Sequence, residues 1–451
     1  MKIIKTSNPK GMRDLIPSKM IRREYILDIM KGTFEKYGFG PISTPAMENM
    51  ETLNGKYGDE GDRLIFKVLK SGNFLSEYDS ELDELNFKKI VNKISDKALR
   101  YDLTVPLARF VSQHRNEIIF PFKRYQIQNV WRADRPQKGR FREFMQCDVD
   151  IIGSKSLFPE IELIQLVDEV FHKLSIKNVK ICINNRKILM SMIDHMGVSD
   201  KFNDIVILID KIDKLGIETV EKEMRRVGVS DAGIKIFNEF LNSESISKIS
   251  NIFTESDIGF EGINELIFIQ KVIKEIGLQS SELVFDISLA RGIDYYTGSI
   301  FEVKQNDISI GSIAGGGRYD DLTSLFGFND VSGVGISFGI DRIFYLMDAF
   351  KLFPDDICLS TDVLFLNLGL EESVHVLKMI KKLRNLGIAS ELYPNMDKVK
   401  KQMSYADRKG VKFVVIVGED EIKCNKISVK DMNTGEQHMY SLNDFLKDLQ
   451  K

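Results

Sequence analysis

Two strand-like runs, from Phe122 to Arg132 and from Phe141 to Ile152, constrain the fold more than any other feature of the sequence. A polar loop of eight residues, from Ala133 to Arg140, joins them, and this pattern predicts a long β-hairpin. Successive side chains of a strand point to opposite faces of the sheet, so each run has two distinct sides. We therefore predict a sheet with one face in the core and a polar opposite face.

The second run separates apolar from polar residues by position. Its mostly apolar odd positions are Phe141, Met145, Cys147, Val149 and Ile151, and its even positions are Arg142, Phe144, Gln146, Asp148 and Asp150. On the first run, one face is shared by Arg124, Gln126, Gln128 and Arg132. The polar face is interpreted as the floor of a binding site, although a half-exposed sheet with one solvated face would give the same alternation.

The hairpin also concentrates positive charge. The stretch from Lys123 to Glu143 contains seven bases, five of them arginines, and two acids, whereas the whole chain has a net charge of −3. The planar guanidinium group suits bidentate binding of phosphate. The charge therefore predicts a phosphate or nucleic-acid site in the hairpin, and the near-neutral chain restricts any nucleic-acid contact to such local patches.

Composition excludes several other classes of protein. The chain has 451 residues, 43% of them hydrophobic and 29% charged, which is typical of a folded protein of roughly three domains. No window of 18 residues is free of charge, so no membrane span is expected, and the segment from Met1 to Lys5 does not resemble a targeting peptide. Four scattered cysteines favour a reducing cytosol, and five scattered histidines predict no structural metal site.

The rest of the chain predicts helices, further strands and a separate C-terminal unit. Helices are expected at 21–37, through most of 160–275 and from near Gly339, and Arg342 lies in the first turn of the last of these. Strands are expected at 283–289, 294–303 and 334–338. A turn cluster is expected at 311–318. An acidic stretch from Glu77 to Glu84 is interpreted as a solvated excursion. After the break at Pro354-Asp355-Asp356, a β-α-β-α-β order is expected, with strands at 362–368, 388–393 and 411–417 and helices at 371–386 and 397–409.

Six motifs in register resemble those of a known family. The stretch from Arg132 to Phe144 resembles motif 2 of the class II aminoacyl-tRNA synthetases, and Leu289 to Gly298 is similar to the signature of the histidyl-tRNA synthetases. The other four matches are Pro9-Lys10-Gly11-Met12-Arg13-Asp14, Leu99 to Pro106, Gly316-Gly317-Arg318-Tyr319-Asp320 and the motif 3-like Phe338-Gly339-Ile340-Asp341-Arg342.

The resemblance implies an α+β fold in two domains. A class II catalytic domain with an antiparallel sheet would occupy residues 1–355 and contain a helical insertion at about 186–278. An α/β anticodon-binding domain would occupy residues 360–451. The resemblance also implies a homodimer in the cytoplasm, and an activity that attaches L-histidine to tRNA(His) through a histidyl-adenylate, with release of AMP and pyrophosphate.

The resemblance implies roles for several candidate residues in ATP binding. Arg132 and Arg291 would be catalytic and would hold the α-phosphate from two sides. Arg140 and Arg342 would hold the outer phosphates of a bent ATP. The adenine would lie between Arg342 and Phe144, with Asp134 near its amino edge. Mg²⁺ is expected to accompany ATP, but no residue could be named as its ligand.

The remaining candidates would bind histidine and tRNA. An ammonium group calls for a carboxylate and neutral acceptors, which the resemblance places at Asp102, Leu103, Thr104 and Gln146. The imidazole would meet Asp150 and Tyr296, with Tyr295 and Arg291 nearby. From the residues alone, the preferred interpretation of Asp102 is a helix cap or turn residue ahead of Leu103. The candidate tRNA contacts are Arg135, Gln137 and Arg142 in the hairpin, and Lys398, Lys400, Lys401, Arg408 and Lys412 in the tail.

Two alternatives compete with this interpretation. A regulatory subunit of ATP phosphoribosyltransferase would keep the catalytic fold, but such proteins lack the C-terminal domain and often the signature arginine, whereas this chain has both Arg291 and a full tail. A nucleic-acid-binding protein with a dead active site would have lost Arg132, Arg140 or Arg342, and all three are present. The basic run from Asp397 to Lys412 has six bases and two acids, and from composition alone a solvated helix face is favoured over a nucleic-acid surface.

Overall fold

The computed structural model describes residues 5–54, 63–72, 91, 94–136, 139–243, 246–250, 258–291, 295–308, 310–354, 357 and 361–449. The chain divides into two compact units. The first comprises Met1–Asp14 and Tyr25–Leu352, and the second comprises Leu15–Glu24 and Phe353–Lys451. The acidic stretch from Glu77 to Glu84 lies outside the described residues, as do Gln137 and the middle of the signature motif, 292–294.

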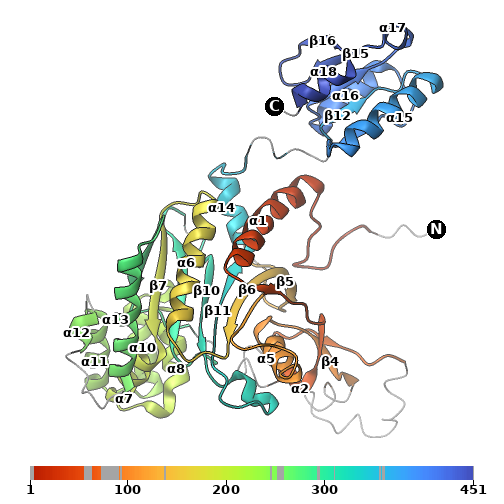
Figure 1. Cartoon of the computed structure of the whole chain (residues 1–451). Helices are drawn as coiled ribbons and strands as arrows, with labels where there is room; N and C mark the ends of the chain where they lie inside the picture. Colours follow the sequence, from red (N-terminus) through yellow and green to blue (C-terminus); the bar gives the residue numbers. More distant parts are fainter. Residues whose placement is uncertain are drawn as a thin grey trace. The chain divides into compact units, whose positions relative to one another are not determined.

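An eight-stranded sheet forms the centre of the first unit (Figure 1). Its strands lie in the order β1-β5-β6-β11-β10-β9-β7-β8. Their bounds are β1 Gly40–Pro41, β5 Phe122–Trp131, β6 Glu143–Ile152, β11 Gly333–Gly339, β10 Ala314–Tyr319, β9 Ser299–Gln305, β7 Val179–Asn185 and β8 Ser281–Phe285. Only the two outer pairs are parallel, and all inner pairs are antiparallel. The expected α+β class is confirmed.

The predicted hairpin is present as β5 and β6, which pair from Phe122 opposite Ile152 to Trp131 opposite Glu143. Its apolar face is in the core, because Cys147, Val149 and Ile151 are at most 3% exposed. Two helices, α1 (Pro17–Lys36) and α6 (Phe158–Lys173), cover this face through aromatic contacts. The rings of Phe34 and Phe171 lie 5.8 and 6.0 Å from the ring of Phe338 on β11. The helix expected at 21–37 thus begins one turn earlier, at Pro17.

A group of helices follows β7 and precedes β8 in the chain, and it lies on one side of the sheet (Figure 1). It comprises α7 Arg186–His195, η2 Ser199–Lys201, α8 Phe202–Ile209, α9 Ile212–Leu215, α10 Ile217–Val227, α11 Asp231–Leu241, α12 Ile246–Ser250 and α13 Ile258–Ile276. The expectation of a mostly helical stretch at 160–275 missed β7, where Val179, Ile181 and Ile183 are buried within the sheet. Among the described residues no helix is both long and apolar enough to cross a bilayer.

The turn cluster predicted at 311–318 is wrong, because most of it forms β10. Three consecutive glycines are unfavourable in a strand, and this led to the error. Here β10 is fixed on both sides by β9 and β11, and its glycines allow close packing. A Cβ on Gly316 would lie 1.9 Å from the carbonyl oxygen of Gly335. The neighbouring strand β9 begins at Ser299 and not at the predicted residue 294.

Smaller elements complete the first unit. A three-stranded sheet has the order β2-β4-β3, with β2 Met47–Asn49, β4 Lys97–Leu99 and β3 Lys67–Val68. Beside it lie α2 Met50–Leu53, α5 Thr104–Gln113 and η3 Leu322–Phe326. Helix α14, Ile340–Ala349, follows β11 directly and carries Arg342 in its first turn, as predicted.

The second unit is built on a five-stranded sheet with the order β13-β12-β14-β15-β16. Its elements are β12 Val363–Phe365, α15 Leu370–Asn385, β13 Ser390–Leu392, α16 Val399–Lys409, β14 Phe413–Ile416, α17 Glu419–Lys423, β15 Ile427–Asp431, β16 Gln437–Tyr440 and α18 Leu442–Leu449. The first five elements follow the predicted β-α-β-α-β order, with parallel strands. The antiparallel strands β15 and β16 and the helices α17 and α18 were not predicted.

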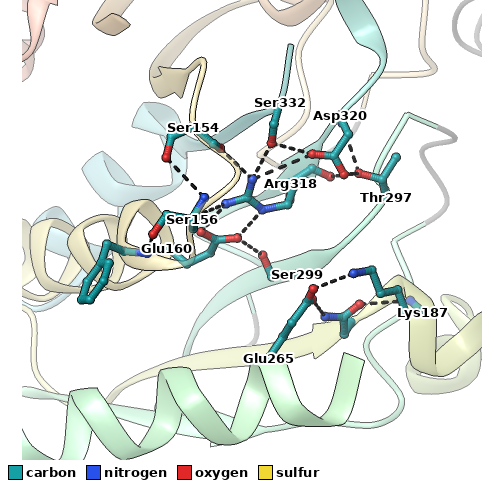
Figure 2. Close-up of polar contacts among 12 residues, drawn as sticks. Ser154, Ser156, Glu160, Lys187, Glu265, Thr297, Ser299, Arg318, Asp320 and Ser332 are labelled. Atoms are coloured by element: carbon teal, nitrogen blue, oxygen red, sulfur yellow. Dashed lines mark hydrogen bonds and ion pairs between the residues drawn. The ribbon is translucent and has the colours of Figure 1, made fainter. Parts of the chain in front are cut away.

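One buried ion pair fastens the central sheet to α6 (Figure 2). Arg318 of β10 donates to both carboxylate oxygens of Glu160, each at 2.6 Å, and the two side chains are 7% and 0% exposed. The same guanidinium donates to the carbonyl oxygens of Ser154 and Ser156, at 3.0 and 2.7 Å. Burying two charges is tolerated only when each is paired and hydrogen-bonded, and this pair meets that condition.

Removing one partner of this pair should therefore destabilise the first unit strongly. We expect Glu160→Ala to lower the free energy of unfolding by about 3–5 kcal/mol, because Arg318 would remain buried and uncompensated. The control is Glu223→Ala, which breaks an exposed pair with Arg226 and should cost less than about 1 kcal/mol. Urea unfolding followed by circular dichroism measures the free energy of unfolding of both variants. Equal losses of stability would show that the buried pair contributes no more than the exposed one.

Candidate active site

The polar face of the hairpin carries a ladder of buried side chains. The register pairs Arg124 with Asp150, Gln126 with Asp148, and Gln128 with Gln146. Arg124, Gln126, Asp148 and Asp150 are at most 4% exposed. These residue pairs are therefore not part of a solvated sheet face. Their buried polar groups must find partners within the protein or in a ligand.

Asp150 is held by one ion pair and one hydrogen bond. Its Oδ2 atom lies 2.6 Å from Nη2 of Arg124, and its Oδ1 atom accepts a hydrogen bond from the hydroxyl of Tyr319 on β10. Burial raises the pKa of Asp150, while the charge of Arg124 and the Tyr319 hydrogen bond oppose the rise. The carboxylate is therefore fixed in orientation before any ligand arrives.

Asp148 and Gln146 have unused hydrogen-bonding capacity beside Asp150. Burial raises the pKa of Asp148 to about 7, against the lowering effect of Arg124, and the charge of Asp150 adds to the rise. Gln146 donates from Nε2 to Ser337 Oγ at 3.1 Å. Asp148 Oδ1 and Gln146 Oε1 are buried and have no hydrogen-bond partner among the described residues.

Glycines in β10 and β11 let site side chains lie directly against the strand backbone. A Cβ at any of three positions would fall within 1.9–2.8 Å of such a side chain. These positions are Gly315 under Arg291, Gly317 under Tyr296 and Gly335 under Asp150. Real Cβ atoms do not approach this closely, so these strands require glycine where the site is built.

The described part of the signature motif places three candidates together. Arg291 has a positive φ of 38° and donates from Nη1 to the carbonyl oxygen of Phe301 at 3.1 Å, while its buried Nε has no partner among the described residues. Its guanidinium lies 5.8 Å from the ring of Tyr296, and the rings of Tyr295 and Tyr296 are 4.8 Å apart. Burial raises the pKa of both tyrosines.

The segment at the start of α5 lies next to this cluster. Asp102 Oδ1 accepts from the backbone N–H of Val105 at 3.2 Å, which is the helix-capping role that the sequence left open. Thr104 hydrogen-bonds Tyr295, whose pKa is also raised by the charge of Asp102. Leu103 is fully buried, and its carbonyl oxygen accepts from Leu107.

A second group of candidates surrounds the base of the hairpin loop. The guanidinium of Arg132 lies 4.2 Å from the ring centroid of Tyr101 and 5.3 Å from that of Phe144. Arg140 donates to Asp134 at 3.1 Å. Burial lowers the pKa of Arg342, and the positive charge of Arg140 lowers it further. The two guanidinium groups are therefore close enough to repel each other, and a bound anion would offset this repulsion.

Two tyrosines connect the groups electrostatically. Burial raises the pKa of Tyr296; the positive charge of Arg291 opposes this rise, and the negative charges of Asp150 and Asp148 add to it. Burial likewise raises the pKa of Tyr101. The charges of Arg132 and Arg140 lower this pKa, and those of Asp134 and Asp102 raise it. The sequence candidates for ATP and histidine are therefore neighbours in one site, although they come from five separate segments of the chain.

The candidate tRNA contacts fall into two places. In the first unit Arg135 is exposed, Arg142 is half-buried and donates to the carbonyl oxygen of Asp134 at 3.0 Å, and Gln137 lies outside the described residues. In the second unit Lys398, Lys400, Lys401 and Arg408 are exposed and Lys412 is half-buried. Lys401 pairs with Asp397 at 2.9 Å and Lys412 with Asp362 at 3.7 Å.

Sequence reasoning did not assign Arg124, Asp148 or Tyr319 to the site. Arg124 and Asp148 were placed on the polar face, and the hairpin register would have paired Arg124 with Asp150. Tyr319 belongs to a motif that was recognised without a role. No group of three or more His, Cys, Asp or Glu that could hold a metal ion is present among the described residues.

Comparisons with known proteins agree with this architecture. A family model for histidyl-tRNA synthetase matches residues 72–343, and one for an anticodon binding domain matches residues 363–451. The histidine–tRNA ligase of Christiangramia forsetii is 50% identical over 446 residues, which cover 97% of this chain and 98% of that protein. The corresponding ligase of Flavobacterium johnsoniae is 49% identical and covers 96% of each chain.

Solved structures show the same fold. The histidyl-tRNA synthetase from Nostoc sp. PCC 7120 matches with a TM-score of 0.82 and 28% identity over 99% of each chain. A Bacillus halodurans protein described as an ATP phosphoribosyltransferase regulatory subunit/histidyl-tRNA synthetase matches with a TM-score of 0.72, over 90% of this chain and 97% of that chain. At 21% identity, the second match bears on the fold alone.

The raised pKa of Asp148 predicts a pH dependence of stability. Because its pKa is about 7 in the folded chain and about 3.9 when unfolded, the folded state binds an extra proton between these values. Its contribution to stability is therefore greatest below about pH 4 and is lost as the pH rises to about 7. Asp148→Asn cannot titrate, so its stability relative to the original chain should improve from about pH 5 to about pH 7 and then level off.

Thermal unfolding at several pH values measures this difference. The matched control is Asp231→Asn, whose carboxylate is 90% exposed, and it should give an offset that does not vary with pH. A constant offset for Asp148→Asn as well would mean that its carboxylate does not carry the extra proton.

Proposed function

The chain belongs to the histidyl-tRNA synthetases and uses ATP to attach L-histidine to tRNA, and we propose that the polar face of the central sheet is where it forms the histidyl-adenylate. In this reaction the carboxylate of histidine attacks the α-phosphate of ATP and expels pyrophosphate. The ribose at the 3′ end of the tRNA then takes the histidyl group and AMP leaves. Both reactants of the first step are anions, so positioned cations supply much of the catalysis.

One observation carries the location of the site. Gln146 Oε1, Asp148 Oδ1 and Arg291 Nε are buried polar atoms without a hydrogen-bond partner among the described residues. Leaving such atoms unpaired costs about 1–3 kcal/mol each, and groups of this kind persist where a ligand satisfies them. Two acceptors and one cationic donor match a ligand that has both an ammonium group and an anionic group.

The histidine site follows from the chemistry of its substrate. Asp102, Thr104 and Gln146 provide a carboxylate and neutral acceptors for the ammonium group. Asp150 accepts from an imidazole N–H, and Tyr296, with Tyr295 beside it, meets the other ring nitrogen. Analogues without these ring nitrogens would leave buried polar groups unpaired, which gives steep discrimination.

The ATP site lies at the base of the hairpin loop and the start of α14. Arg132 and Arg291 bind the α-phosphate from two sides, and Arg140 and Arg342 bind the outer phosphates. Phe144 and Arg342 enclose the adenine, and Asp134 lies at its amino edge. Mg²⁺ enters with ATP as part of the substrate, in keeping with its preference for phosphate oxygens and water over a full set of protein ligands.

Two domains divide the work. Residues 1–355 form the catalytic domain, with the helical insertion at about 186–278, and residues 360–451 form the anticodon-binding domain. Arg135, Gln137 and Arg142 contact the acceptor end of tRNA(His), and the exposed bases of α16 contact phosphates of its anticodon arm. The protein acts as a homodimer in the cytoplasm, where its tRNA is used.

Arg291 provides the most direct test of the active site. We expect Arg291→Ala to reduce histidine-dependent ATP–pyrophosphate exchange by about 100-fold or more, because a transition-state donor is lost. Arg226→Ala, in an exposed pair on the helical insertion, is the matched control and should retain full exchange. Unchanged exchange in Arg291→Ala would contradict the assignment.

The basic face of α16 should control tRNA affinity without affecting activation. Lys398 and Lys400 are exposed and have no ion pair among the described residues, so both are available to phosphates. Replacing both by Ala should weaken tRNA binding. It should also reduce the steepness with which the logarithm of the association constant falls against the logarithm of the salt concentration, by up to about 2, because two fewer counterions are released.

Filter binding at several salt concentrations measures this slope. Lys423→Ala, which removes a base paired with Glu419 on α17, is the control and should leave the slope unchanged. Pyrophosphate exchange should be unaffected in both variants. An unchanged slope in the double variant would exclude α16 as a phosphate-binding surface.

A further inference from the structure

We propose that Asp320 is a positioning residue for histidine: its hydrogen bonds to Thr297, which we call the clasp, fix the neighbouring Tyr296 against the backbone of β10. The proposal rests on the histidine site described above, and it assigns a role to the Gly-Gly-Arg-Tyr-Asp motif. In that motif Tyr319 contacts the site directly, through Asp150. Its two neighbours, Arg318 and Asp320, form the clasp.

Hydrogen bonds from both the main chain and the side chain hold Thr297 (Figure 2). Its hydroxyl donates to Oδ2 of Asp320 and accepts from the backbone N–H of Asp320 at 3.1 Å. Its own backbone N–H donates to the carbonyl oxygen of Arg318 at 2.8 Å. Both the main chain and the side chain of Thr297 are therefore fixed to the end of β10.

The clasp is itself anchored to the core. Ser332 Oγ donates to Oδ1 of Asp320 at 2.5 Å and accepts from Arg318, whose guanidinium also lies 3.8 Å from that carboxylate. Arg318 is locked in turn by Glu160 at the start of α6. A continuous chain of polar contacts thus runs from α6 to Thr297, and Figure 2 shows it converging on Arg318.

Thr297 matters because it directly follows the two signature tyrosines. The ring of Tyr296 lies over Gly317, where a Cβ would come within 2.8 Å of Cδ1 of the tyrosine. This leaves little room between ring and backbone, so a small shift of residue 297 moves the ring and its hydroxyl. Misplacement of a contact group by about 1 Å can cost up to 100-fold in rate or affinity.

The test compares three variants in ATP–pyrophosphate exchange. Thr297→Val removes the hydroxyl but keeps the shape, and should raise the KM for histidine about 10-fold while the KM for ATP changes less than twofold. Thr297→Ser keeps the hydroxyl and should behave like the original chain. Thr33→Val is the matched control, because Thr33 is fully buried and its hydroxyl donates to the carbonyl oxygen of Ile29 on α1.

A double variant tests whether the clasp acts through Tyr296. If it does, Tyr296→Phe combined with Thr297→Val should raise the KM for histidine no further than Tyr296→Phe alone, since the hydroxyl to be positioned is already gone. Additive effects, or equal rises in the KM for both substrates, would overturn the proposal. If Tyr296→Phe by itself leaves the KM for histidine unchanged, the site assignment fails and not the clasp alone.

Discussion

The burial of Arg124 between two carboxylates is the constraint on which the active-site face depends. A guanidinium with no exposed surface is tolerated only beside compensating negative charge, which Asp150 provides at 2.6 Å and Asp148 provides more weakly. The pairing in turn requires β5 and β6 to meet in one register, because a shift of one residue would turn the charged row into the core. The core face follows the same register, since Cys147 and Val149 alternate with these acids.

Positively and negatively charged side chains alternate around the row formed by Arg124, Asp148 and Asp150. Arg291 and Arg132 lie near the tyrosines, and Asp102 and Asp150 flank them, so neither sign dominates. Such an arrangement suits a zwitterionic amino acid next to a polyanion. The strand glycines contribute to this arrangement, because they let large side chains lie directly against the strand backbone.

Much of this arrangement could be predicted from the sequence, and its failures have physical causes. The hairpin and the tail followed from period-2 and helical patterns, which local sequence carries. Strand β10 was mistaken for a turn because its glycines disfavour a strand locally, and only its two neighbours make it one. The capping bond of Asp102 could be proposed from the sequence but not distinguished from a ligand contact, because a carboxylate can do either. Tyr319 of β10 could not be matched to Asp150 of β6, since the sequence does not reveal that only β11 separates these strands.

The place of the helical insertion has a consequence for how the fold can vary. Strands β7 and β8 are parallel neighbours, so the chain must return along the length of the sheet between them, and α13 makes this return. Helix α13 packs on α7, β7 and β9, whereas the shorter helices α8 to α12 form a detour within one crossover connection. The detour can lengthen, shorten or be exchanged without altering the order of a single strand, so the protein can acquire a different outer surface while the central sheet keeps its topology.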